Sequence, residues 1–303
     1  MSRPRLRRPR DYPPVPPREL PPARTVLVPG RGEFFLRDTD DGSERAESDS
    51  GRPVVLLLHG WMVSADLNWC GAYEELAQAG YRVLAIDHRG HGRGLRTTAR
   101  FRLTDCAADA AAVLRRLGTG PATVVGYSMG GVIAQLMARN HRDVVSGVVL
   151  SATCQHFQDP ETQRVWRWMG AVGLLLGLAP RQFYSVGLRR LGITLNERTA
   201  WWLAELMRHH SRDVAEAGRE MGRFDSRPWL HAMARLPAAM VMTTRDTAVP
   251  PAKQRELAQA IGARVFEAGI DHLEVIDRAA DYNPALLAAV AEVAVRETAG
   301  AAL

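Results

Sequence analysis

The stretch Thr123-Val124-Val125-Gly126-Tyr127-Ser128-Met129-Gly130-Gly131 decides the fold of this chain. An apolar strand predicted at 122–125 leads into it, and an apolar helix predicted over 129–140 follows it. A serine at such a sharp strand-to-helix turn takes a strained backbone conformation, and side chains two residues on either side would collide with it. Glycine at both positions removes this collision and exposes the hydroxyl. The spacing therefore predicts that Ser128 is a nucleophile.

Strand and helix patterns alternate on both sides of this turn. Strands are predicted at 25–28, 33–36, 54–58, 82–86, 122–125, 144–150, 239–243 and 264–267. Helices are predicted at 74–79, 104–117, 129–140, 252–261 and 284–297. Such alternation favours right-handed crossovers and helices on both faces of a sheet. The predicted fold class is α/β, with a mostly parallel, doubly wound sheet of about eight strands.

A long segment without convincing strands interrupts this alternation after the sixth strand. Residues 155–236 contain Trp-rich and Leu-rich helical patterns and are too long for a plain loop. Helices are predicted here at 162–178, 181–191 and 197–210 and around 214–221. They are predicted to form a helical cap on a core made of 24–154 and 237–303. Residues 1–23 are predicted to be a disordered basic arm, rich in proline and arginine, because they have too little apolar surface to offset the entropy of ordering.

Composition and charge exclude several classes of protein. The chain has 303 residues, of which 46% are hydrophobic and 24% charged, a balance typical of globular proteins. The uncharged run 168–180 is too short to span a membrane. Residues 1–24 hold seven arginines against two acidic residues, and therefore five of the six net positive charges. We expect no nucleic-acid partner and no transmembrane segment; the alternative to a solvated arm is weak contact with an anionic surface.

Cysteine usage and the arm's composition bear on the compartment. The three cysteines are far apart and form neither a CxxC pair nor a metal-ligand spacing. The arm lacks the apolar centre that a signal peptide requires. We therefore expect reduced thiols and a cytoplasmic location.

A serine nucleophile needs a base, and one of the nine histidines is well placed for this role. His272 follows the last strand, on a loop at the carboxyl edge of the sheet, where the sites of open α/β sheets lie. Asp246 follows the preceding strand at the same edge and is predicted to orient the imidazole. Its rivals are Asp271, adjacent to the histidine, and Asp159, in the insertion.

Acyl transfer also needs backbone donors for an oxyanion. Met129 directly follows the nucleophile and is predicted to supply one N–H. The other is expected from the loop His59-Gly60-Trp61-Met62, with Trp61 as the donor and Met62 as the alternative. His59 is expected to brace this loop by hydrogen bonds.

Aromatic and apolar side chains near the turn and in the cap are candidates for substrate binding. They are Trp61, Met62, Tyr127, Trp166, Trp168 and Phe183. An apolar cap predicts an apolar acyl group or ring in the substrate, although most such residues are expected to form the cap's own core. No cofactor and no metal ion is predicted to be required.

These features together resemble the α/β-hydrolase superfamily over residues 24–298. The features are the order Ser128, Asp246, His272, the His-Gly-x loop at 59–61, the D-H-R-G-H-G stretch at 87–92 and the capped parallel sheet. The Ser-Met-Gly-Gly sequence is similar to serine esterases and monoacylglycerol-lipase-like members. Epoxide hydrolases and haloalkane dehalogenases of the superfamily carry aspartate at the nucleophile position, so Ser128 argues against both.

The resemblance implies a serine hydrolase that cleaves a carboxylic ester of a small molecule or lipid-like compound through an acyl-enzyme. A C–C bond hydrolase, a thioesterase and a cofactor-free perhydrolase would use the same triad and remain alternatives. A ligand receptor on a hydrolase fold is the alternative outside enzymes, and multiple turnover would distinguish the two. The natural substrate, the acyl length and the oligomeric state stay open.

Overall fold

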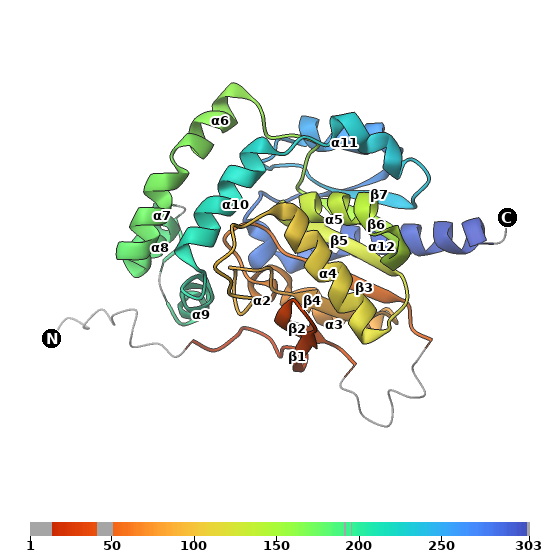
Figure 1. Ribbon diagram of the computed structural model, residues 1–303, viewed down its shortest axis with the longest axis horizontal. Helices are drawn as coiled ribbons and strands as arrows, with labels where there is room; N and C mark the ends of the chain where they lie inside the picture. Colours follow the sequence, from red (N-terminus) through yellow and green to blue (C-terminus); the bar gives the residue numbers. More distant parts are fainter. Residues whose placement is uncertain (1–13, 41–50, 191, 195, 302–303) are drawn as a thin grey trace, which may run out of the picture.

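Eight strands form one open sheet in the computed structural model, which describes residues 14–40, 51–190, 192–194 and 196–301. The strands are β1 (Ala23–Val28), β2 (Gly32–Asp38), β3 (Val54–Leu58), β4 (Arg82–Ile86), β5 (Ala122–Tyr127), β6 (Val145–Ser151), β7 (Ala238–Thr243) and β8 (Arg264–Ala268). Their order is β1-β2-β4-β3-β5-β6-β7-β8. The pairs β1–β2 and β2–β4 are antiparallel, and the remaining pairs are parallel. The predicted α/β class is confirmed (Figure 1).

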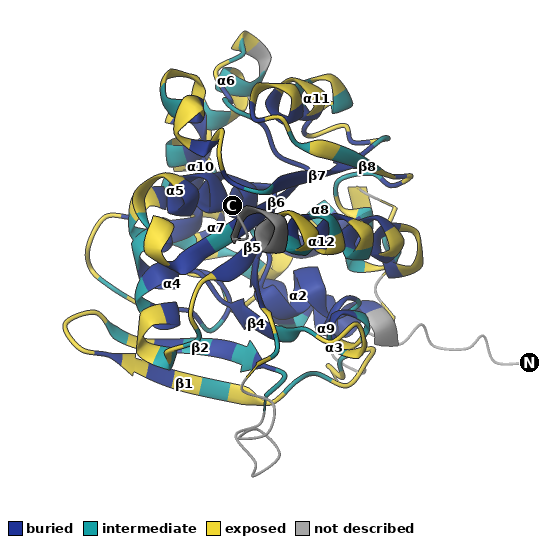
Figure 2. Ribbon diagram, turned by 90° about the vertical axis from the view of Figure 1, so that its right-hand side faces the viewer, coloured by how far each residue is buried: buried dark blue, intermediate teal, exposed yellow. Residues whose placement is uncertain are grey.

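Helices cover both faces of the sheet and bury its central strands. One face packs against α4 (Leu103–Leu117), α5 (Met129–Asn140) and α11 (Pro251–Ala260). The other packs against α2 (Ala65–Trp69), α3 (Tyr73–Gln78) and α12 (Ala279–Ala301). Every residue of β3, β5 and β7 is buried, which explains their continuous apolar sequences (Figure 2). The carboxyl ends of these strands are therefore held rigidly; Ser128 follows β5 and Asp246 follows β7, whereas His272 follows the less buried strand β8.

Helices make up most of the described part of the insertion between β6 and β7, which also contains an isolated β-bridge between His156 and Asp225. They are α6 (Pro160–Arg167), α7 (Met169–Leu178), α8 (Pro180–Arg190), α9 (Glu197–Leu206), α10 (Ser211–Arg223) and the short 3₁₀ helix η3 (Arg227–Met233). Small residues on α10 allow close packing: a Cβ on Gly218 would lie 2.5 Å from Met169, and one on Gly222 would lie 2.6 Å from Trp166. The single helix predicted over 162–178 is wrong, because the chain turns at Trp168 and so packs both α6 and α7 on α10.

The predicted arm is only partly described. Residues 14–22 have no helix or strand, Leu20 is partly buried against α2 and its neighbours, and the carbonyl of Pro21 accepts a hydrogen bond from Arg37 (2.9 Å). Residues 1–13 lie outside the described residues. The division into arm, core and cap therefore stays a prediction. In the described ranges, no helix is long and apolar enough to cross a membrane.

Candidate active site

The turn at Ser128 has the strained geometry that the sequence predicts. Ser128 has φ 54° and ψ −115°, and its N–H donates to the carbonyl of Ser151 on β6 (2.9 Å). A Cβ on Gly126 would lie 2.3 Å from the carbonyl oxygen of Gly130, and one on Gly130 would lie 2.1 Å from that of Leu58. The glycines therefore let α5 start against the ends of β5 and β3, where larger residues would collide with backbone.

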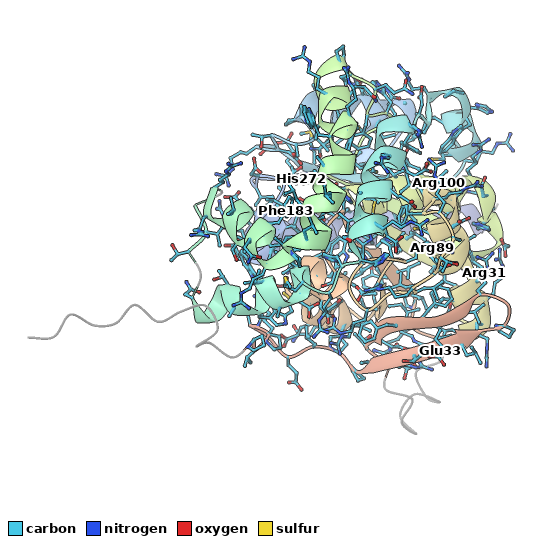
Figure 3. All side chains as sticks on the ribbon, turned by 60° about the vertical axis from the view of Figure 1, so that its left-hand side comes forward. Arg31, Glu33, Arg89, Arg100, Phe183 and His272 are labelled. Atoms are coloured by element: carbon cyan, nitrogen blue, oxygen red, sulfur yellow. The ribbon has the colours of Figure 1, made fainter. Side chains whose placement is uncertain are left out.

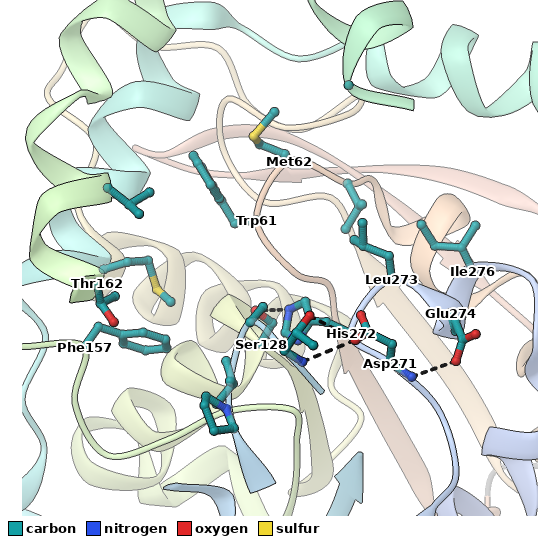
Figure 4. Close-up of a pocket in the computed structure, with 18 of the residues that line it drawn as sticks. Trp61, Met62, Ser128, Phe157, Thr162, Asp271, His272, Leu273, Glu274 and Ile276 are labelled. Carbon is teal, nitrogen blue, oxygen red and sulfur yellow. Dashed lines mark hydrogen bonds between the residues drawn. The ribbon is translucent and has the colours of Figure 1, made fainter. Parts of the chain in front are cut away.

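The structure brings the three predicted catalytic side chains together. The Oγ atom of Ser128 lies 3.0 Å from Nε2 of His272, and Nδ1 of His272 lies 2.7 Å from Oδ2 of Asp246. They follow β5, β8 and β7, at the carboxyl edge of the sheet, and Figure 4 shows Ser128 beside His272. If the neutral imidazole carries its proton on Nδ1, it donates to the carboxylate and accepts from the serine hydroxyl. This arrangement can remove a proton from Ser128.

Asp246 is buried, and its charge is fully hydrogen-bonded. Its Oδ1 accepts from the N–H groups of Ala248 (2.9 Å) and Val249 (2.7 Å), and its Oδ2 accepts from the Thr243 hydroxyl (2.7 Å). Gln254 in turn donates to the Thr243 hydroxyl (2.8 Å) and the Val249 carbonyl (2.7 Å). Sequence reasoning missed Thr243 and Gln254, which fix the loop that holds the carboxylate.

The rival carboxylates bond elsewhere. Asp271 accepts from the hydroxyl of Thr247 (3.0 Å) and from its N–H (3.3 Å). Asp159, at the start of α6, forms an ion pair with Lys253 of α11. Of the three candidate acids, Asp246 is therefore the one that hydrogen-bonds to the imidazole of His272.

Tyr127 holds the backbone of the histidine. Its hydroxyl donates to the carbonyl of His272 (2.7 Å), and its buried ring packs against Trp69 and Tyr282 with centroid distances of 6.2 and 5.9 Å. Burial raises the pKa of Tyr127 well above its usual value, so the hydroxyl stays protonated and donates. Tyr127 does not line the cavity described below. The structure therefore places Tyr127 against the backbone of His272, and a contact between Tyr127 and the substrate stays a prediction.

The loop after β3 lies beside the nucleophile. The N–H of Gly60 donates to Oδ1 of Asn68 (2.9 Å), and a Cβ on Gly60 would lie 3.5 Å from that of Ser128. His59 braces the loop, because its Nδ1 bonds the Gly60 carbonyl (2.7 Å) and its Nε2 accepts from the N–H of His88 (3.0 Å). Burial lowers the pKa of His59 well below its usual value, which keeps it neutral. The roles of the Trp61 or Met62 N–H and of the Met129 N–H as oxyanion donors stay predictions.

A cavity of about 1250 Å³ opens at Ser128 and His272. Apolar side chains dominate its walls: Val63, Leu67, Phe157, Tyr184, Leu188, Trp202, Leu206, Met221 and Ile276. Figure 4 shows Phe157 and Thr162 on one side of the catalytic pair and Leu273 and Ile276 on the other. The cavity therefore offers two apolar regions with the nucleophile between them.

Four of the six predicted substrate residues line this cavity, namely Trp61, Met62, Trp166 and Phe183. The indole N–H of Trp61 donates to the carbonyl of Val214 on α10 (2.8 Å), so this side chain joins the core to the insertion. Trp168 is 70% exposed and lies outside the cavity. It lies at the turn between α6 and α7.

Packed histidines, of which His59 and His91 are buried and His209 is partly buried, link the core to the insertion, a feature that sequence reasoning missed. The rings of His59 and His91 lie 5.6 Å apart, and those of His91 and His209 lie 5.3 Å apart. The N–H of Gly92 donates to Nδ1 of His209 (2.9 Å). Burial lowers the pKa of His209 to about 4. Within the described residues, no group of His, Cys, Asp or Glu is arranged to hold a metal ion.

Comparison with known proteins identifies the family of this chain. A family model described as alpha/beta hydrolase fold matches residues 53–278. The chain belongs to this family. Members of this fold family carry their catalytic serine at a strand-to-helix turn above the sheet, the position that Ser128 occupies here.

Individual relatives match parts of this alpha/beta hydrolase. A non-heme haloperoxidase from Rhodococcus erythropolis is 42% identical over 113 residues, 36% of this chain and 40% of the relative. A bifunctional esterase/perhydrolase from Acinetobacter calcoaceticus is 37% identical over 116 residues, 37% of this chain and 42% of the relative. The chain thus matches less than half the length of these curated relatives.

Solved structures extend the similarity to the whole fold. The enol-lactonase from Burkholderia xenovorans LB400 superposes with a TM-score of 0.71 at 23% identity, over 88% of this chain and all of the other. At this identity the likeness shows the fold alone.

Proposed function

We propose that this alpha/beta hydrolase is a serine esterase that cleaves carboxylic esters through an acyl-enzyme. One observation carries the proposal: Ser128 Oγ, His272 and Asp246 form a continuous chain of contacts of 3.0 and 2.7 Å at the wall of an apolar cavity. Nucleophile, base and orienting acid within hydrogen-bond reach are the arrangement that acyl transfer requires.

The steps of the reaction follow from this geometry. His272 takes the hydroxyl proton as Ser128 attacks the ester carbonyl, and Asp246 stabilises the imidazolium. His272 then gives the proton to the departing alcohol, which leaves the acyl group on Ser128. Water repeats the sequence, with His272 again as base, and releases the acid. The N–H groups of Met129 and of Trp61 or Met62 are the proposed oxyanion donors.

The cavity supports an ester with apolar groups on the carbonyl side, the alcohol side or both. Its two apolar regions flank Ser128, and Trp166 and Phe183 extend them into the insertion. Burial of an apolar acyl group there would contribute about 0.8 kcal/mol per methylene. A small-molecule or lipid-like ester with apolar groups fits these walls. A cytoplasmic location stays part of this proposal.

Ester turnover and covalent labelling test the proposal. The purified chain is expected to hydrolyse p-nitrophenyl esters of graded chain length over many cycles and to react with a fluorophosphonate. Ser128→Ala should lose both activities, with kcat reduced by about 10⁴–10⁶-fold, while circular dichroism stays unchanged. If the folded variant retained a tenth of the wild-type rate, the nucleophile would be another residue.

Perhydrolysis is a second candidate, favoured by the name of the Acinetobacter relative. In that reaction hydrogen peroxide replaces water at the acyl-enzyme and yields a peroxycarboxylic acid, with Ser128 regenerated. Peracid formation from an ester and peroxide, lost in Ser128→Ala, would support it. Hydrolysis without any peracid would exclude it.

A further inference from the structure

Helix α7 is apolar on all sides, yet half of it faces solvent. Its sequence over Met169–Leu178 contains no polar side chain. Met169 and Leu176 are buried, and a Cβ on Gly173 would lie 2.8 Å from Ala215, so this face packs on α10. The opposite face is open to solvent. An all-apolar helix is normally covered on every side, so α7 needs a partner that the described chain does not supply.

The exposed face of α7 continues into the turn before it. Of the eleven large apolar side chains that are exposed in the described part of the chain, five lie here. They are Val165, Trp168, Leu174, Leu175 and Leu178, and they form what we call the apolar patch. Trp168 is 70% exposed and Leu178 76%. Clustering of this kind marks an interaction surface, whereas singly scattered apolar residues need no explanation.

The shape of the molecule leaves this patch accessible. Figure 1 places α6, α7 and α8 on the outer side of the insertion, away from the sheet. Figure 3 brings this side forward and shows the insertion helices with Phe183 and His272 labelled.

Positive charge surrounds the apolar patch. The segment 160–190 contains five arginines and one acidic residue. Arg164 and Arg167 precede Trp168 on α6, and Arg181 follows Leu178 at the start of α8; all three are exposed. Aliphatic and Trp side chains beside arginines are the composition of helices that lie in the interface of anionic membranes. A second copy of this chain would bring two sets of arginines together, which disfavours self-association through this face.

The apolar patch also reaches the catalytic cavity. Val165, which is 54% exposed, and its neighbour Arg164 belong to the wall of the cavity that contains Ser128 and His272. A surface that covers the patch therefore lies at the rim of this cavity.

We propose that the apolar patch docks this protein on anionic lipid surfaces, with α7 lying in the interface, so that the cavity takes esters dissolved in the lipid. The docking stands on the patch and its arginines; the delivery of esters rests on the proposed function.

Vesicle sedimentation with the full chain tests the docking. Vesicles of phosphatidylcholine and phosphatidylserine are expected to bind the protein, and vesicles of phosphatidylcholine alone to bind it less. The double variant Leu175→Gln/Leu178→Gln should lower the partition coefficient by about tenfold or more, because two large apolar side chains no longer insert. Leu27→Gln is the matched control, since Leu27 is 58% exposed on β1, and should bind like wild type. Arg167→Gln/Arg181→Gln should reduce binding to the anionic vesicles only.

Each contrary outcome is distinct. Absence of binding by the wild type, or equal binding by the leucine variant, would overturn the docking. So would a dimer in sedimentation velocity without lipid that the leucine variant abolishes, because the patch would then be an interface between copies. Turnover of a short, water-soluble ester should be the same in wild type and leucine variant. If the wild type bound vesicles but did not turn over this ester, the proposed function would be refuted and the docking would still be supported.

Discussion

The core and the insertion are built from similarly apolar sequences but bury them differently. Strand β5 and its neighbour β3 have every residue buried, whereas α7 has no polar side chain and leaves half of its surface exposed. Contact between backbones fixes the core, as at Gly130, which has no room for a Cβ against β3. This difference indicates separate roles. The core fixes the catalytic geometry, whereas the insertion leaves apolar surface exposed that can contact a substrate or a partner.

Buried polar contacts help to attach the insertion to the core. Glu205 of α9 is buried and pairs with Arg93 at 2.8 and 3.0 Å, and it also accepts from the Ser64 hydroxyl (2.8 Å). Burial acts to raise the pKa of Glu205, but these donors outweigh it and lower the pKa. The Trp61 indole and the ring of His209 provide further links, in addition to the ion pair of Asp159 with Lys253. Predictions that separate the two regions therefore target either backbone packing or these side-chain links.

The largest effect is expected at the catalytic acid of the core. Asp246→Asn should lower kcat by about 10⁴-fold, because the amide stabilises the wrong tautomer of His272. Asp271→Asn and Asp159→Asn, measured in the same ester assay, should keep most of the activity. A larger loss at Asp271 than at Asp246 would overturn the assignment.

Glycine-to-alanine substitutions should change the free energy of unfolding in opposite directions in the core and in the insertion. Gly130→Ala should lower the free energy of unfolding by about 3 kcal/mol or more, since the new Cβ meets backbone 2.1 Å away. Gly187→Ala on α8 meets nothing within 4 Å and should raise stability by about 0.5–1 kcal/mol. Urea unfolding measures both. A neutral Gly130→Ala would show that the turn has more room than its contacts indicate.

Acid should loosen the link made by His209. Its pKa is about 4 in the folded chain and about 6.5 when unfolded, so the unfolded state binds more protons and stability falls as pH drops below 6.5. Between pH 7.5 and pH 5 this residue should account for a loss of about 2 kcal/mol. Arg96 and Glu205 lie near enough to act on it with opposite signs.

His209→Asn keeps an acceptor near Gly92 without the titration. Urea unfolding at both pH values should show a smaller pH dependence in this variant. An unchanged pH dependence would place the acid sensitivity elsewhere.

The smallest effect concerns specificity. Phe183→Ala enlarges the cavity and should shift relative kcat/KM toward longer acyl groups by about tenfold. Deletion of residues 2–13 should leave kcat/KM within about threefold. We expect the insertion, and not the N-terminal arm, to select the substrate. An ester profile that changes after the deletion but not after the substitution would contradict this expectation.

Sequence predicted the core more accurately than the insertion. The bounds of β3, β4 and α5 match the prediction, because periodicity and glycine placement are local signals. The order of Ser128, Asp246 and His272 along alternating strands was enough to predict their meeting at one edge. The order of strands and helices along the chain is therefore enough to predict where the three candidate catalytic residues lie.

The parts that sequence did not predict depend on tertiary contacts. The turn at Trp168 follows from packing on α10, and the hydrogen bond of Tyr127 was not predicted because its partner, the carbonyl of His272, lies far away in the chain. Helix α12 begins five residues before the predicted start at Pro284, because packing around the buried Tyr282 outweighs the missing hydrogen bond. Local sequence patterns do not predict these tertiary contacts.

Trapping of the acyl-enzyme tests the central claim most directly. The protein is mixed with a p-nitrophenyl ester of an apolar acid, quenched in acid during the first turnovers, digested and measured by mass spectrometry. We expect the acyl mass on the peptide that contains Ser128, and no adduct in Ser128→Ala. Turnover with the acyl group on another residue, or with an unmodified Ser128 peptide under conditions where release of the acid is rate-limiting, would contradict it.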